Sequence, residues 1–192
     1  MNKKLIIITL MFFLSLSCKS KMNEVNQKTG ENLKVMLEEL QKKFPEPVSF
    51  QSIMFSFDEA LGNTLLVKIA GNADSSKIHE WFYINGMWES STEKIMEDDS
   101  LAFTDHFFTS GTDYKLSTLI EVLSLATEKA EEDKDLDNYM VRSINLSMGN
   151  QLVNNNKMEN LVTQVTIESK ADNKRYLANF NSQGSFISIL EE

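Results

Sequence analysis

The sequence predicts an α+β protein made of two tandem repeats, each with one helix packed on a four-stranded antiparallel meander sheet. Two observations lead to this fold class. Segments 65–91 and 163–189 resemble each other when they are aligned without a gap, which places Phe82 against Phe180. In both halves of the chain, a helix-like stretch comes first, a strand-like stretch follows it, and the aligned segment comes last. We therefore interpret most of the chain as an internal duplication.

The helix of each repeat is expected where apolar residues recur at helical spacing. The two stripes consist of Leu33, Met36, Leu37 and Leu40, and of Leu116, Leu119, Ile120 and Leu123. They predict helices at 31–43 and 113–132. The candidate N-caps are Thr29 for the first helix and Thr112 or Asp113 for the second. Pro45 and Pro47 are expected to stop the first helix.

Strands are expected where apolar and polar residues alternate. The alternating apolar positions are Ile53, Phe55, Phe57, Leu65, Val67, Ile69, Ile144, Leu146, Met148, Val165 and Ile167. Hairpin turns are predicted around 73–77 and 171–175. Asn85-Gly86 is a strong signal for a two-residue turn, because both residues accept positive φ, and Gln183-Gly184 is a weaker one. Connections this short force neighbouring strands to be antiparallel.

The predicted organisation has five parts: a signal peptide (1–17), a lipidated N-terminus and tether (18–30), a first repeat (31–91), a connection (92–112) and a second repeat (113–192). This plan, with Tyr176…Gly184 followed by alternating apolar residues, resembles the PepSY-like and β-lactamase-inhibitor-protein-like domains. The resemblance implies an exported module of a kind that often occurs in tandem. It transfers no functional residue to this chain.

The first eighteen residues have the order of charge, apolar core and small-residue exit that is typical of a secretory signal. Lys3 and Lys4 precede an apolar stretch at 5–14, which is about half of the ~20 residues that span a bilayer. Cys18 is the only cysteine and follows the small residue Ser17. This exit resembles the lipobox of bacterial lipoproteins, although Ser15 stands where leucine is usual.

The resemblance implies that the chain is cut before Cys18, that the thiol is acylated with a lipid such as palmitate, and that the protein is anchored in the membrane. The residue after the cysteine is Lys19 rather than aspartate. This resembles the sorting rule for an outer-membrane destination. An ordinary signal peptidase would cut at the same bond without lipidation, and this alternative stays open.

Charge and motifs exclude several classes of function. The formal net charge is −9, which makes nucleic-acid binding improbable because phosphate backbones are repelled. No Gly-x-Ser-x-Gly elbow and no zinc-ligand spacing is present, so we expect no enzyme, no cofactor and no metal. Asp133, Asp135 and Asp137 have the spacing that opens an EF-hand loop. The loop then has Asn138 instead of glycine and Ile144 instead of the bidentate glutamate.

An aromatic surface is the candidate binding site. If Phe82 points toward the helix, strand alternation places His79, Trp81 and Tyr83 on the opposite face. Trp88 would join them across the Asn85-Gly86 turn. Two interpretations compete. The surface is either covered by the connection at 92–112, which supplies Leu101, Phe103, Phe107 and Phe108, or exposed to a partner protein.

The sequence therefore predicts a membrane-anchored envelope lipoprotein that acts as a non-enzymatic protein-binding or inhibitory module. The expected partner is another envelope protein. Two alternatives remain: a structural or accessory component of an envelope complex, and a carrier of a small ligand.

Overall fold

The computed structural model describes residues 28–70, 77–90, 94–95, 106–134, 136–148 and 161–192. Several sequence-based predictions lie outside these residues. They are the signal peptide, the lipidation site Cys18, most of the turn at 73–77, the apolar residues Leu101 and Phe103, and the central Asp135 of the acidic motif.

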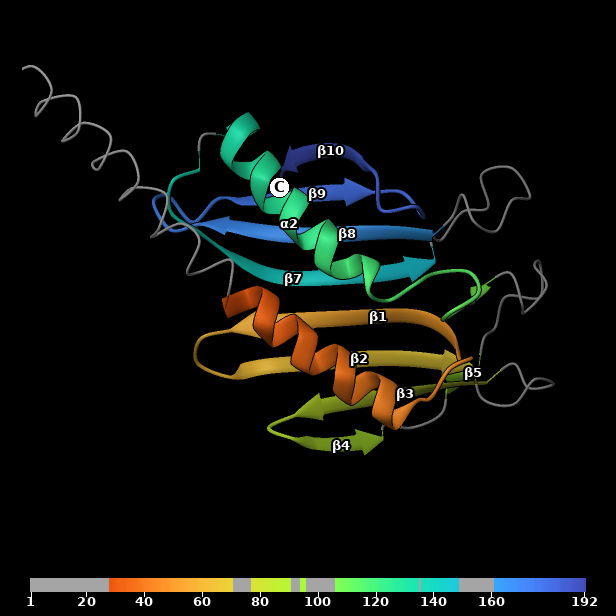
Figure 1. Ribbon diagram of the computed structural model, residues 1–192. Coiled ribbons are helices and arrows are strands. Elements are labelled where there is room, and N and C mark those ends of the chain that lie inside the picture. Colours follow the sequence, from red (N-terminus) through yellow and green to blue (C-terminus); the bar gives the residue numbers. More distant parts are fainter. Residues whose placement is uncertain (1–27, 71–76, 91–93, 96–105, 135, 149–160) are drawn as a thin grey trace, which may run out of the picture.

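All named strands of the described residues belong to one antiparallel sheet (Figure 1). The strands are β1 (Ser49–Asp58), β2 (Gly62–Ala70), β3 (Lys77–Ile84), β4 (Met87–Ser90), β5 (Lys94–Ile95), β6 (Phe108–Thr109), β7 (Tyr139–Met148), β8 (Leu161–Ser169), β9 (Arg175–Phe180) and β10 (Phe186–Glu191). Their order is β10-β9-β8-β7-β1-β2-β3-β4, with β5 paired to β3 and β6 paired to β1.

The predicted fold class, two tandem modules that each have a helix on their own four-stranded sheet, is wrong. β1 and β7 pair directly, with Ile53 opposite Leu146 and Phe55 opposite Ile144. This pairing makes a single sheet. The buried hydrophobic side chains, apart from Ile78 and Phe107, also form one continuous cluster. The resemblance between segments could not reveal this junction, because local patterns do not specify which strand edges meet.

The described residues contain two helices, α1 (residues 28–43) and α2 (Thr118–Lys134), and both cover the same face of the sheet (Figure 1). The first helix ends before Pro45, as predicted. It already includes 28–30, so the last three residues of the predicted tether are helical. Thr29 is buried within the helix and is not its N-cap.

The start of the second helix also differs from the prediction. Asp113 does not cap α2; its carboxylate accepts a hydrogen bond from the Thr109 N–H at 2.8 Å, one turn outside the helix. A tight turn follows, in which the Thr118 N–H donates to the Lys115 carbonyl. The helix therefore begins five residues later than predicted.

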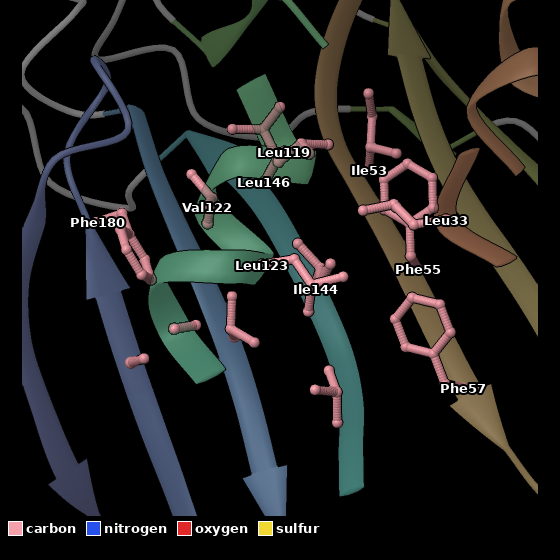
Figure 2. Packing of buried hydrophobic residues seen from close by; sticks show 14 of the residues in the cluster. Leu33, Ile53, Phe55, Phe57, Leu119, Val122, Leu123, Ile144, Leu146 and Phe180 are labelled. Atoms are coloured by element: carbon pink, nitrogen blue, oxygen red, sulfur yellow. The ribbon is translucent and has the colours of Figure 1, made fainter. Parts of the chain in front are cut away.

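The core lies between the helices and the sheet (Figure 2). Leu33 from α1 and Leu119 from α2 are fully buried, next to Phe55 and Leu146 of the central strands (Figure 2). The predicted alternation is confirmed at every position except Ile69, which is half-buried. The 92–112 connection contributes Phe108 of β6, which packs on Phe50 with ring centroids 5.8 Å apart.

The Asn85-Gly86 turn is confirmed, since both residues have positive φ, of 52° and 81°. Gly184 also has positive φ, but its turn is wider: the Asn181 side chain accepts hydrogen bonds from the backbone N–H groups of Gln183 and Ser185. The first turn therefore fixes the β3–β4 register tightly, and Tyr83 lies opposite Trp88 as expected.

Candidate functional site

The predicted aromatic surface lies on the face of the sheet that carries the helices. Trp81 is paired with Val67 and Tyr83 with Leu65, and both partners belong to the buried core. His79 lies in the same row of alternate positions, opposite the half-buried Ile69. The prediction that these side chains point away from the helix is therefore wrong.

The end of α1 covers these aromatic side chains. Phe44 makes edge contacts with Trp81 and Trp88, with centroid distances of 5.8 and 5.3 Å, and the Tyr83 and Trp88 rings are 5.2 Å apart. The Lys43 ammonium lies 4.2 Å from the Trp81 ring centroid. The aromatic residues therefore close the end of the core, and of the predicted cover by the connection, Leu101 and Phe103 lie outside the described residues.

A one-residue difference between two hairpins explains the wrong face. Val67 pairs with Trp81, but Val165, its match in the gapless alignment, pairs with Ala178 rather than with Asn179. The β2–β3 connection is thus one residue longer than the alignment requires. A slip of one residue moves every side chain of a strand to the other face. Phe82 is accordingly 41% exposed, whereas Phe180 is fully buried.

The opposite side of the sheet, which we call the outer face, carries two straight rows of directly opposed residues across eight strands. From β4 to β10, row one consists of Glu89, Phe82, Leu66, Met54, Asn145, Gln164, Asn179 and Ser188. Row two consists of Met87, Ile84, Thr64, Ser56, Ser143, Thr166, Leu177 and Leu190. None of these residues is buried.

The two rows are almost free of charge. Glu89, at the β4 edge, is the single charged residue among their sixteen positions, whereas 24% of the whole chain is charged. A solvent-facing surface of average composition would carry about four charges here. Depletion of charge is the compositional signature of the centre of a protein–protein interface.

Row two changes from apolar to polar and back, with Met87 and Ile84 at one margin, Leu177 and Leu190 at the other, and hydroxyl groups between them. Row one is apolar from Phe82 to Met54 and polar from Asn145 to Ser188. Gln164 donates to the Asn179 side-chain oxygen at 3.0 Å, and Asn179 donates to the Ser188 hydroxyl at 3.3 Å. The amide row is thus held in place by its own hydrogen bonds.

Two open hollows lie on the outer face along the β1–β7 seam, on either side of Met54. The first, of about 410 Å³, is lined by Ser52, Ser147, Lys68 and His106 among others. The second, of about 520 Å³, is lined by Ser56 and Ser143 together with charged residues near the sheet end. Small serine side chains leave this space because their neighbours across the seam are serines too.

The charged end of the second hollow is internally neutralised. Glu168 accepts hydrogen bonds from Arg142 at 2.6 Å and from Arg175 at 3.1 Å, and these bonds hold the pKa of its carboxyl below the usual value. The Ala60 and Leu61 N–H groups donate to the Asp58 carboxylate, which lowers its pKa as well. In the first hollow, the Lys68 ammonium lies 3.4 Å from the Glu80 carboxylate. Each of these charges bordering the rows therefore has an intramolecular partner.

Sequence reasoning missed this surface. Its only local signal was the string of small polar residues at alternate positions of β1 and β7, Ser52, Ser56, Ser143 and Ser147. These residues become one surface only once β1 is known to pair with β7.

Comparisons with protein-family models, with curated proteins and with solved structures found no match for this chain. Within the part of the chain that the structure describes, no group of three or more histidine, cysteine, aspartate or glutamate side chains is arranged to hold a metal ion. None of the described helices is both long and apolar enough to cross a membrane.

Proposed function

We propose that this chain is an exported, membrane-anchored envelope lipoprotein that acts as a non-enzymatic protein-binding module through the outer face of its sheet. The observation that carries the proposal is the near absence of charge from two rows of solvent-facing residues in an acidic chain. The anchor is proposed from Cys18 and the signal that precedes it.

The dimensions of the outer face suit a macromolecule. Eight neighbouring strands at ~4.8 Å spacing and strand lengths of ~25 Å give an area of roughly 800–900 Å². A standard protein–protein interface needs about 800 Å² on each partner. The hollows are open to solvent, whereas small-molecule pockets bury roughly 70–90% of their ligand. They therefore give no support to the small-ligand carrier.

Photo-crosslinking in living cells tests the binding face. A photoreactive amino acid is placed at Thr64 or at Thr166, which are row-two positions on either side of the seam. We expect a discrete adduct whose yield falls when Ser143→Arg fills the centre of the face. Ser124→Arg is the matched control, because Ser124 is exposed on α2, on the other side of the molecule.

The identity of the adduct decides the result. The crosslinked protein is identified by mass spectrometry, purified and titrated against the wild type and the two arginine variants. A loss of affinity confined to Ser143→Arg supports the proposal. Equal binding by the two variants, or no adduct from either position, contradicts it. The anchor is tested separately by the mass of the N-terminal peptide, where an unmodified Cys18 would refute lipidation.

A further inference from the structure

Resting on the proposed function, we infer that the partner of the outer face is a second copy of this chain, related by a two-fold axis parallel to β1 and β7. In this arrangement the β4 margin of one copy lies over the β10 margin of the other. The β1–β7 seam of one copy then lies over the same seam of the other copy.

The pattern of row two is compatible with itself under this rotation. Met87 and Ile84 of one copy lie over Leu190 and Leu177 of the other, and Thr64 and Ser56 lie over Thr166 and Ser143. Row one instead places Phe82 and Leu66 over Asn179 and Gln164, so the inference rests on row two. The Met87 and Leu190 side chains are 61% and 57% exposed. The rotation brings Met87 of each copy over Leu190 of the other.

Charge favours a self-contact at this face. Two copies of a chain with a formal charge of −9 repel each other over most orientations. This repulsion is reduced at the outer face, because its two rows carry only Glu89 and the bordering Lys68, Glu80, Arg142 and Glu168 are paired internally. With the axis parallel to the strands, Glu89 lies over Ser188 of the other copy. A perpendicular axis along row one would instead place Glu89 over Glu89.

The apolar margin at β2–β4 also resembles the centre of a protein–protein interface in its residue types. Phe82, Met87 and Leu66 form a contiguous apolar group, since Phe82 is opposite Leu66 and Met87 follows on the next strand. Aromatic and methionine side chains are the types enriched at such centres. The serine-lined hollows leave room for water between the polar centres.

Sedimentation velocity of the full chain in a density-matched detergent tests the inference over a wide range of protein concentration. We expect a monomer–dimer equilibrium. Met87→Lys and Leu190→Glu are each expected to raise the dissociation constant at least about tenfold. Val35→Lys is the matched control, because Val35 on α1 is 56% exposed and its change should leave the equilibrium unaltered.

The double variant Met87→Lys/Leu190→Glu tests the orientation. A parallel axis places the new ammonium group of each copy over the new carboxylate of the other, so two ion pairs form and dimerisation recovers most of the loss. A perpendicular axis along row two places like charges together, and the double variant would then be weaker than either single one. That result, or single variants that do not weaken the dimer, overturns the inference. Thermal melting of each variant confirms that it is folded.

The failure of this inference is distinguishable from that of the proposed function. A chain that stays monomeric at every concentration, but forms a crosslink from Thr64 or Thr166 to a different protein, overturns the dimer and keeps the binding face. A monomeric chain without any crosslink overturns both.

Discussion

Two glycines in hairpin turns allow the energetic cost of backbone strain to be separated from the cost of overpacking. Gly86 and Gly184 have nearly the same φ, +81° and +77°. An added Cβ at Gly86 meets nothing within 4 Å, whereas at Gly184 it would lie 2.8 Å from Thr118 Cγ2 and 3.3 Å from Val122 Cγ2. Substitution by alanine therefore imposes a similar backbone cost at both sites, and a steric cost only where the β9–β10 turn contacts α2.

The magnitudes follow from these distances. A left-handed conformation costs a non-glycine residue roughly 1–2 kcal/mol, and the lower entropy of the unfolded alanine chain offsets ~0.4–1 kcal/mol of it. Gly86→Ala should therefore destabilise the protein by about 1 kcal/mol. Overpacking adds roughly 1–3 kcal/mol at Gly184. We expect a total of about 2–4 kcal/mol for Gly184→Ala.

Equilibrium unfolding in urea, followed by far-UV circular dichroism, measures both free energies. Thr118→Ser removes the methyl group that lies closest to the new Cβ, so it should restore part of the stability of Gly184→Ala. The double-mutant cycle then isolates the contact. Equal destabilisation by the two glycine variants, or no coupling between positions 118 and 184, would show that the turn does not press on α2 as described.

Three further predictions concern individual side chains. Glu168→Gln should cost about 1–3 kcal/mol, because Arg142 and Arg175 lose their shared anion. The folded-state pKa of Glu168 lies below its ordinary value of 4.5, so its contribution is present at neutral pH and is lost as the pH falls through the folded-state pKa. Unfolding free energies measured down to about pH 3 should show a weaker acid dependence in the variant, and an unchanged one would refute this role. Phe44→Ala should cost about 2 kcal/mol, less than the ~3–5 kcal/mol of a fully buried phenylalanine, and should shift tryptophan emission to the red because Trp81 and Trp88 lose their cover. An unshifted spectrum would contradict the docking of α1 at this site. Burial raises the pKa of the Tyr114 phenol above 10.0, so an absorbance titration should show a late-ionising tyrosine that Tyr114→Phe removes.

The local elements were readable from the sequence because local physics determines them. Alternation at Ile53, Phe55 and Phe57 located β1 and its buried face, and Pro45 located the end of α1. The Asn85-Gly86 pair determined its turn, since few other residues accept positive φ twice in succession. These features depend on neighbours within a few positions of the chain.

The fold class and the site depended on long-range pairing. Nothing near β1 in the sequence indicates that its second edge is taken by β7, so separate sheets were predicted where one exists. The faces of β3 depended on a single residue in the connection to β2, and the gapless alignment lost that residue. The prediction therefore places Trp81 on the outer face and misses the two rows that are almost free of charge.

The junction of β1 with β7 also sets the order in which the chain can assemble. The middle of the finished sheet joins segments about 90 residues apart, so the first half of the chain is synthesised with the inner edge of β1 still open. Until β7 emerges, that edge offers its backbone groups to any other extended strand. We expect the nascent protein to be most vulnerable to aggregation during this interval, and a chaperone that shields residues 49–58 would protect it most.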